Sequence, residues 1–255
     1  MWSQERHDRI LAMLSERHRV TTETAARELG VSKETVRRDL IELEQTGKLS
    51  RVHGGAVPAA VPVEASYAER ALSRQRQKRA IGQVAAGLLR SGSTCLIDAG
   101  STTRALAQVL AQTPGLTALR VITNSVAVAD ALAGSGHHEV MLLGGDYHAD
   151  LQATLGAFTV AEIGRHRVDL AFISPTALDA AMGATSYLWE EVAVAQAMLS
   201  QARGRVLLAD ASKLGQGSRM QVCRCTDIDV LVTDADADPQ ALERLRQAGV
   251  GEVMR

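Results

Sequence analysis

The chain has 255 residues, of which 46% are hydrophobic and 22% are charged, and its formal net charge at pH 7 is −1. This composition predicts a small N-terminal domain followed by a larger globular one, and any affinity for phosphates must come from local clusters of cations. No apolar run reaches the roughly 18 residues of a membrane span, and MWSQERHDR lacks the apolar core of a signal peptide, so we expect no membrane partner and a cytoplasmic location.

Apolar residues recur at helical spacing in three successive segments between residues 6 and 45. Gly30 can take the left-handed conformation that ends the second helix, and Ser32 can cap the third. A sharp junction between two helices is typical of a helix-turn-helix. The core positions expected for the three helices are Ile10, Leu11 and Leu14; Ala25, Ala26 and Leu29; and Val36, Leu40 and Leu43.

Polar side chains gather near the N-terminal end of the third helix, the end that meets base edges in helix-turn-helix proteins. Arg can pair with guanine O6 and N7 or with phosphate, and Ser and Thr hydroxyls can contact phosphates or bases. A solvated surface is the ordinary interpretation of the Arg37-Arg38 pair alone, but the whole pattern favours DNA. The predicted DNA contacts on this helix are Ser32, Lys33, Thr35, Arg37 and Arg38.

Residues 6–57, with VSKETVRRDL, the Gly47-Lys48-Leu49 turn and RVHGGA, resemble the N-terminal domain of the DeoR family of bacterial transcriptional regulators. The resemblance implies a winged helix-turn-helix over residues 1–57, in which RVHGGA forms the wing. Gly54 and Gly55 permit backbone geometry there that bulkier residues would resist. Two residues of this stretch join the predicted DNA contacts, namely Arg51 and His53.

A linker is predicted over residues 58–66, PAAVPVEAS, where two prolines and small residues interrupt regular structure. The second domain would then cover residues 67–255. Its first segment, YAERALSRQRQKRAIGQVAAGLLRSG, is predicted to be a helix that ends at Gly92. The basic run over residues 70–79 is interpreted as a solvated helix face, with a role against DNA or an anionic effector as the alternative.

From residue 94 onward, strand-like runs alternate with helical segments, which predicts an α/β domain with a mostly parallel sheet flanked by helices. In open sheets of this kind, ligands gather at the carboxyl ends of the strands. The strand-like runs are TCLIDAG, LRVITNS, EVMLLGG, VDLAFISP, RVLLADAS and DVLVTDAD.

Several of these strand ends are polar and glycine-rich. A helix that opens at DAGSTT could hold a phosphate on its backbone N–H groups, although each short motif alone is more often a cap, turn or bend. The arrangement resembles the DeoR-family sensor domain, which is similar in fold to ribose-5-phosphate isomerase and commonly binds phosphorylated sugars. The predicted effector-site residues are Asp98, Gly100, Ser101, Thr102, Thr103, Thr123, Asn124, Ser125, Gly144, Gly145, Glu191, Asp210 and Lys213.

One segment, YLWEEVAVAQAMLSQA, departs from the family. It has Ala193, Ala195 and Gln196 where family members often show a glutamate followed by lysine and arginine, and Glu191 alone keeps the pattern. The identity of the effector therefore stays open. The three cysteines, Cys95, Cys223 and Cys225, lack the paired spacing of a zinc site, so we expect no metal, with metal binding or oxidant sensing by Cys223 and Cys225 as the alternative. We also expect no cofactor.

These features predict a DNA-binding transcriptional regulator, a repressor of a carbohydrate or related operon that responds to a phosphorylated sugar or similar metabolite. Its partners would be a double-stranded DNA operator, the effector and further copies of the chain, because one small reading head meets few base pairs. The main alternative is a sugar-phosphate isomerase or related enzyme with an accessory DNA-binding domain, in which Asp98 or Glu191 is the base and Lys213 stabilises an enediolate. An architectural DNA-binding protein with a ligand-free assembly domain agrees less well with such polar strand ends.

Overall fold

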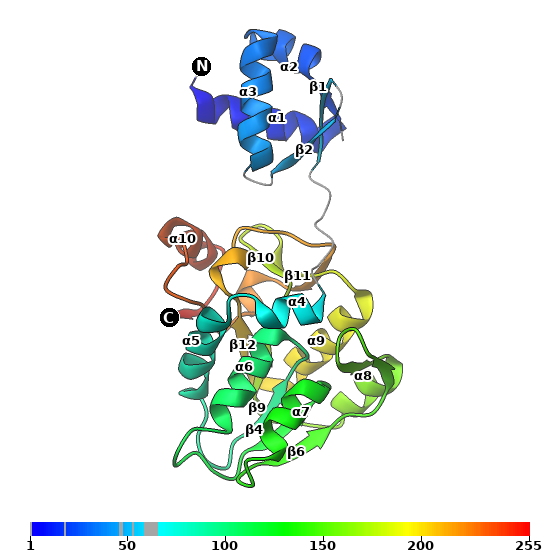
Figure 1. The fold of residues 1–255 in the computed structure, drawn as a ribbon, viewed down its shortest axis with the longest axis vertical. Helices are drawn as coiled ribbons and strands as arrows, with labels where there is room; N and C mark the ends of the chain where they lie inside the picture. The colour runs from blue at the N-terminus through cyan, green and yellow to red at the C-terminus, as the bar shows by residue number, and fades with distance from the viewer. Residues whose placement is uncertain (1, 18, 46–47, 53, 59–65) are drawn as a thin grey trace. The chain divides into compact units, whose positions relative to one another are not determined.

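The computed structural model describes residues 2–17, 19–45, 48–52, 54–58 and 66–255. The chain divides into two compact units, Met1–Val63 and Glu64–Arg255 (Figure 1). None of the helices in the described ranges combines the length and the apolar composition that a membrane crossing requires.

The N-terminal unit is a trihelical bundle with a small antiparallel sheet of strand order β1-β3-β2. Its apolar core contains every position expected from the helical spacing, with Leu11 only partly buried at its margin. The winged helix-turn-helix predicted from the sequence is therefore what the structure shows. The elements are α1 (Ser3–Arg17), β1 (Val20–Thr21), α2 (Thr22–Leu29), α3 (Lys33–Gln45), β2 (Leu49–Val52) and β3 (Gly55–Pro58).

Local chemistry sets the turn between α2 and α3. Gly30 has φ 66°, and its backbone N–H donates to Ala26 O, so it ends α2 in the left-handed conformation. Ser32 Oγ accepts from the Thr35 backbone N–H at 3.0 Å, which caps α3. Both predictions for this turn are confirmed, whereas Gly47 of the predicted second turn lies outside the described residues.

The larger unit is built on a seven-stranded sheet of order β15-β14-β12-β9-β4-β5-β6. Every neighbouring pair in this sheet is parallel, which confirms the predicted α/β class. The strands are β4 (Thr94–Ile97), β5 (Arg120–Thr123), β6 (Glu139–Leu142), β9 (Val168–Ile173), β12 (Ala202–Leu208), β14 (Val230–Val232) and β15 (Glu252–Met254).

Helices cover both faces of this sheet (Figure 1). Successive strand side chains point to opposite faces, so Ile97 packs in the core with α5, α6 and α7, while Leu96 packs in the core with α8, α9 and α10. The helices are α4 (Tyr67–Leu72), α5 (Gln75–Ala86), α6 (Ser101–Leu110), α7 (Val126–Ala133), α8 (Ala157–Ile163), α9 (Trp189–Gln201) and α10 (Pro239–Gln247).

Two small antiparallel sheets and one helix break were not predicted. The predicted helix over residues 67–92 is interrupted at Ser73 and Arg74, where Arg74 takes the left-handed conformation with φ 49°, and α5 ends at Ala86. The short strands are β7 (Asp146–His148) with β8 (Ala153–Leu155), and β10 (Ala177–Asp179) with β11 (Gly183–Ser186) and β13 (Met220–Cys223); η1 (Ala211–Lys213) and η2 (Cys225–Asp227) are 3-10 turns.

Candidate DNA-reading surface and effector site

The exposed face of α3 carries most of the predicted DNA contacts. Lys33, Arg37 and Arg38 are exposed, and Thr35 is half-buried in the first turn. The Ser32 hydroxyl is engaged with the helix backbone as its cap. The structure thus places the three cations on the solvent side of α3, while the two hydroxyls also shape the start of the helix.

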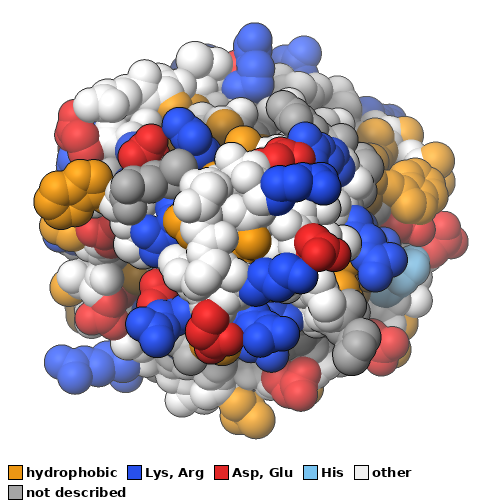
Figure 2. All heavy atoms as spheres, turned by 90° about the horizontal axis from the view of Figure 1, so that it is seen from above, with side chains coloured by type: hydrophobic (Ala, Val, Ile, Leu, Met, Phe, Trp, Pro, Cys, Tyr) orange, Lys and Arg blue, Asp and Glu red, His pale blue; other side chains and the backbone are white. Residues whose placement is uncertain are grey.

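Carboxylates of the same unit pair with these exposed cations. Red and blue side chains alternate over the face drawn in Figure 2, so the basic residues do not form a continuous patch. Arg38 is exposed and has no ion pair within the described part of the chain. Any DNA contact by the paired cations must compete with these internal partners. The pairs are Lys33–Glu23 at 2.8 Å, Arg37–Glu34 at 3.2 Å and Arg51–Glu44 at 3.4 Å.

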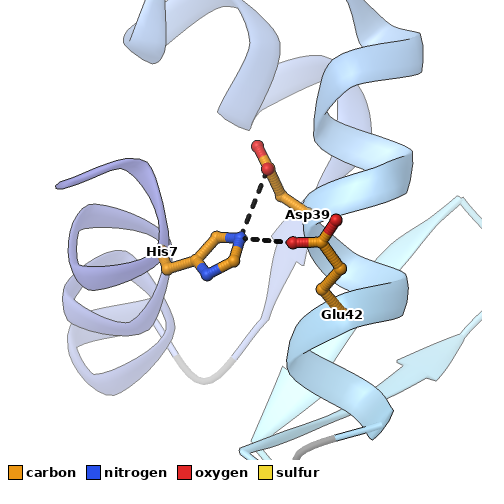
Figure 3. Close-up of side chains that lie close together, drawn as sticks. All are labelled: His7, Asp39 and Glu42. Carbon is orange, nitrogen blue, oxygen red and sulfur yellow. Dashed lines mark hydrogen bonds and ion pairs between the residues drawn. The ribbon is translucent and has the colours of Figure 1, made fainter. Parts of the chain in front are cut away.

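One buried carboxylate fastens α1 to α3. Arg6 donates to both oxygens of Asp39, from Nε and Nη2 at 2.8 Å each. His7 Nε2 lies 3.3 Å from Asp39 Oδ1 and 3.5 Å from Glu42 Oε2 (Figure 3). Because the Arg6 guanidinium already occupies Asp39, we interpret this cluster as a structural fastening that fixes the orientation of α3, not as a metal site.

The wing is the β2–β3 hairpin, which pairs with β1. Gly55 lies opposite Thr21, and a Cβ atom on Gly55 would lie only 2.2 Å from Val20 O. Only glycine therefore fits the close approach of β3 to β1. Arg51 is exposed on β2. The last predicted contact, His53, lies outside the described residues.

The carboxyl ends of β4 and β9 lie side by side where the connections of the large sheet diverge. From β4 the chain winds toward β5 and β6, and from β9 it winds toward β12 and β14. Open α/β sheets bind ligands at such a switch point. Asp98 Oδ2 accepts from the Ser174 backbone N–H at 2.8 Å, and Lys213 Nζ donates to Ser174 Oγ at 3.1 Å. We call Asp98, Ser174 and Lys213 the switch-point group.

Asp98 is a buried carboxylate with one oxygen unpaired. Its residue is 8% exposed, and its Oδ1 has no hydrogen-bond partner within the described ranges. Burial raises the pKa of Asp98 to about 6, and the Ser174 N–H and the Lys213 cation limit the rise. A bound hydroxyl group could donate to the open oxygen.

The first turn of α6 lies directly after this carboxylate. Gly100 precedes the helix, and a Cβ atom there would lie 3.2 Å from Ser174 Cβ, so the two strand ends pack tightly. The Thr102 hydroxyl is fully buried and has no partner among the described atoms. Beside this turn lies a hollow of about 380 Å³ whose lining includes Lys78, Ser101 and Arg104. The N–H groups of a helix start and nearby cations together favour an anion.

Lys78 brings a buried cation to the same end of the sheet. It is 4% exposed, and its Nζ donates to Ser73 O at 2.9 Å and to Arg70 O, so it caps the last carbonyls of α4. Burial lowers the pKa of Lys78 to about 8, while Asp210 favours its charged form and Lys213 opposes it. An anion near Lys78 would stabilise the protonated state.

The basic run over residues 70–79 is divided between solvent and this site. Arg76 and Arg79 are exposed, as expected for a solvated helix face. The same prediction is wrong for Arg74 and Lys78, because Arg74 Nε lies 2.9 Å from Oδ1 of the buried Asp210 and Lys78 is almost fully buried. The break between α4 and α5 turns these two residues toward the strand ends.

Other predicted effector residues hold the strand ends in place. Thr103, Thr123 and Asn124 donate hydrogen bonds within the protein and Ser125 accepts one, so these residues have structural roles whatever else they contact. Asn124 Oδ1 alone among these groups lacks a partner in the described ranges. The bonds are Thr103 Oγ1 to Asp98 O at 2.9 Å, Thr123 Oγ1 to Ile97 O at 2.7 Å, Asn124 Nδ2 to Thr154 O at 3.0 Å, and Val128 N to Ser125 Oγ at 3.2 Å.

Part of the predicted set lies away from the switch-point group. Gly144 and Gly145 follow the edge strand β6, and a Cβ atom on Gly145 would meet Thr159 Oγ1 at 2.0 Å, so this glycine serves close packing. Glu191 lies in the first turn of α9, on the other face of the sheet from α6. The structure places near this end of the sheet two residues outside the predictions, Arg104 and Ser174, and three from the basic run, Arg70, Arg74 and Lys78, for which an effector role was only the alternative.

The cysteines lie outside the switch-point group. Cys95 and Cys225 are buried and Cys223 is half-buried, and all three are free thiols. Burial raises the pKa of the Cys95 and Cys223 thiols to about 12, which keeps them protonated and poorly reactive at neutral pH.

Two family models match this chain. The DeoR-like helix-turn-helix domain matches residues 6–60, and the DeoR C terminal sensor domain matches residues 73–235. The chain belongs to the DeoR family. This assignment confirms the resemblance drawn from VSKETVRRDL and the strand-end motifs.

Relatives align over nearly the whole length of this DeoR-family chain. The HTH-type transcriptional regulator GlpR of Haloferax volcanii is 35% identical over 247 residues, which cover 96% of this chain and 95% of the relative. The HTH-type transcriptional repressor GlcR of Bacillus subtilis is 33% identical, with 98% and 95% covered. The glycerol-3-phosphate regulon repressor of Escherichia coli is 28% identical, with 91% and 90% covered.

The relatives bear the names of regulators, so the chain is a DNA-binding transcriptional regulator, and the isomerase alternative is disfavoured. Among solved structures, ribose 5 phosphate isomerase A from Neisseria gonorrhoeae matches with a TM-score of 0.41 and 15% identity, over 55% of this chain and 54% of that one. A likeness at this level carries no argument about chemistry, and the assignment rests on the family models and sequence relatives.

Proposed function

We propose that this DeoR-family regulator represses a carbohydrate or related metabolic operon and that a phosphorylated sugar or similar metabolite binds the switch-point group. The names of two relatives, which are repressors, support the sign of the regulation. The observation that carries the proposal is the convergence of Lys213, the start of α6 and the half-satisfied Asp98 at one point of the sheet.

A phosphate and a hydroxyl-bearing carbon chain agree with different parts of this site. The N–H groups at the start of α6, together with the cations Lys213, Lys78 and Arg104, favour the phosphate. The unpaired Oδ1 of Asp98 favours a hydroxyl donor. A neutral sugar could donate a hydrogen bond to the carboxylate, but it has no negatively charged group to interact with the cations.

α4 is the element through which binding would reach the DNA-binding unit in this proposal. It is the first helix after the linker segment, and Lys78 holds its last carbonyls while Arg74 ties the following residues to Asp210. A phosphate that attracts Lys78 would compete with the carbonyls of α4. If the effector binds more tightly to one position of α4 than to another, binding shifts the fraction of molecules that are able to bind DNA.

Residues 1–57 would form the reading head, residues 58–66 the linker and residues 67–255 the sensor. A homo-oligomer is part of the proposal, because paired heads are needed to meet two half-sites of an operator. The predicted contacts Ser32, Lys33, Thr35, Arg37, Arg38, Arg51 and His53 would meet the DNA.

The test measures operator binding by anisotropy of fluorescent DNA from around the protein's own gene, at fixed salt, with inorganic phosphate or each member of a panel of sugar phosphates. We expect one sugar phosphate to weaken binding. The variant Lys213→Ala should keep operator affinity but lose this response. The control variant, Arg76→Ala, removes an exposed cation of α5 and should keep both.

Two results would contradict the proposal. A response of Lys213→Ala equal to that of the wild type would remove Lys213 from the effector site. Conversion of a sugar phosphate into its isomer by the purified chain would favour the enzyme alternative.

A further inference from the structure

A carboxylate lies in the middle of the surface that α3 offers to DNA. Glu34, Arg37, Arg38 and Ile41 follow the spacing i, i+3, i+4, i+7, which places them on one face of the helix. All four are exposed, and this face lies opposite the buried positions of α3. The Glu34 side chain is 73% exposed.

The same face borders a groove beside the wing. Glu34, Arg37 and Ile41 line one side of this groove, while Arg51 and Val52 of β2 line the other. Glu34 is therefore part of the surface between helix and wing, and not a residue on the back of the unit.

A negative charge at this place opposes DNA binding unless it meets a base. Duplex DNA carries one negative charge per roughly 1.7 Å of axis, and charges closer than the Debye length of about 8 Å are only partly screened in physiological salt. A carboxylate can, however, accept a hydrogen bond from the N4 amino group of cytosine in the major groove. The repulsion would then be offset at sites that present cytosine.

The partner of Glu34 points to the same conclusion. Arg37 Nη1 lies 3.2 Å from Glu34 Oε2, one helical turn further along α3. Arg is the residue that most often reads guanine, through O6 and N7. The pair therefore presents a carboxylate acceptor beside the N–H donors of a guanidinium group. This pattern is complementary to cytosine next to guanine.

We propose that Glu34 is a specificity-determining residue that reads a cytosine through its N4 amino group, beside the guanine read by Arg37. This inference rests on the proposed role of α3 as the DNA-reading helix. Glu34 would disfavour guanine and thymine, which offer no amino group in the major groove, and also adenine, whose N6 amino group lies beside the N7 acceptor.

Two other carboxylates of this unit pair with predicted DNA contacts, and one of them provides a control. Glu23 belongs to the first turn of α2 and pairs with Lys33. Glu44 lies near the end of α3, where it also accepts from the Arg51 backbone N–H at 2.9 Å, so it supports the wing. Glu23 also lines the groove beside the wing, but it belongs to α2, so it shares the charge effect of Glu34 without a place on the exposed face of α3.

The experiment selects bound sequences from a pool of randomised duplex DNA with the full-length wild type and the variants Glu34→Ala, Glu34→Gln and Glu23→Gln. Affinity for unselected random DNA is measured at the same salt. We expect Glu34→Ala to lose about 10-fold of cytosine preference at one position and to keep the neighbouring guanine. Glu34→Gln should favour adenine at that position, because an amide pairs with adenine N6 and N7.

All three variants should bind random DNA more tightly, because each removes one negative charge. Glu23→Gln should do so with the base preferences of the wild type. Unchanged base preferences in both Glu34 variants would overturn the proposal. Loss of the guanine preference alone would also overturn it, because Glu34 would then only position Arg37. A wild type that selects no sequence at all would instead contradict the DNA-reading role of α3.

Discussion

Arg74 and Asp210 form an ion pair, with 2.9 Å between Arg74 Nε and Asp210 Oδ1, that joins the break between α4 and α5 to the carboxyl end of β12. Arg74 has φ 49°, a left-handed conformation that costs an ordinary side chain about 1 kcal/mol. Asp210 is 2% exposed, so Arg74 stabilises a buried carboxylate, to which the Lys78 cation also contributes. The strain at Arg74 is thus offset by the pairing.

We expect Arg74→Ala to lower the free energy of unfolding of the sensor unit by about 2 kcal/mol, because Asp210 loses its ion pair and the strained backbone remains. Arg74→Gly should lower it by roughly 1 kcal/mol less, since glycine adopts positive φ without strain. Calorimetry of the full chain checks both, and the alanine variant should melt about 4–8 °C lower. Equal melting temperatures for the two variants would show that the backbone at Arg74 is unstrained.

The basic run shows where sequence reasoning can and cannot place a side chain. Lys78 and Arg74 lie three and seven residues before Ile81, on the side that helical spacing assigns to the apolar face. That spacing was an available sign that the two cations face inward. The break at Ser73 could not be foreseen, because the ion pair that Arg74 makes there is with Asp210, which lies far along the chain.

The DNA-binding unit was more predictable than the effector site for a physical reason. Gly30 and Ser32 act through backbone groups within a few residues of themselves, so their roles follow from local rules. Thr123, by contrast, donates to Ile97 O on a neighbouring strand. Strand-end hydroxyls look alike in a sequence, and only the order of the strands decides which of them remain open to a ligand.

The buried carboxylate of Asp98 should make stability depend on pH. Burial raises the pKa of Asp98 to about 6 from an ordinary value of 3.8. Between pH 4 and 6 the folded chain therefore keeps a proton that the unfolded chain has lost, so raising the pH through this window lowers the free energy of unfolding, by about 3 kcal/mol in total.

Asp98→Asn lacks this ionisation and should lack this part of the pH dependence. Urea unfolding at pH 4.5 and pH 7 gives the free energy of unfolding of both proteins. The difference between wild type and variant is compared at the two pH values. We expect the variant to gain stability relative to the wild type as the pH rises. A difference that stays constant between the two pH values would show that Asp98 titrates as an ordinary carboxylate.

The two glycines of the wing should respond differently to the same substitution. A Cβ atom on Gly55 would lie 2.2 Å from Val20 O, whereas nothing lies within 4 Å of one on Gly54, whose φ is +82°. Gly55→Ala must separate β3 from β1, and we expect a loss of about 3 kcal/mol in the N-terminal unit. Gly54→Ala should cost about 1 kcal/mol through backbone strain alone.

Calorimetry of the full chain and anisotropy on selected DNA distinguish the two glycine variants. Gly55→Ala should lose DNA binding while the sensor unit melts as in the wild type. Gly54→Ala should still bind DNA when the measurement is made below the melting temperature of its N-terminal unit. If both variants lose the same amount of stability, the close approach of Val20 O to Gly55 is not the reason that this position requires glycine.

The adjacent arginines Arg37 and Arg38 should affect DNA binding in different ways. Arg38 is exposed without an ion pair in the described ranges, whereas Arg37 is held by Glu34 at 3.2 Å. A free cation that meets a phosphate releases one counterion, so Arg38→Ala should reduce the slope of log K against log salt by about 0.9, both on selected and on random DNA. Arg37→Ala should mainly reduce the preference for the selected sequence, by about 10-fold, because a guanine contact is lost. Anisotropy titrations of both DNAs over a series of salt concentrations separate these effects, and an Arg38 variant that loses selectivity without a change of slope would place Arg38 on a base.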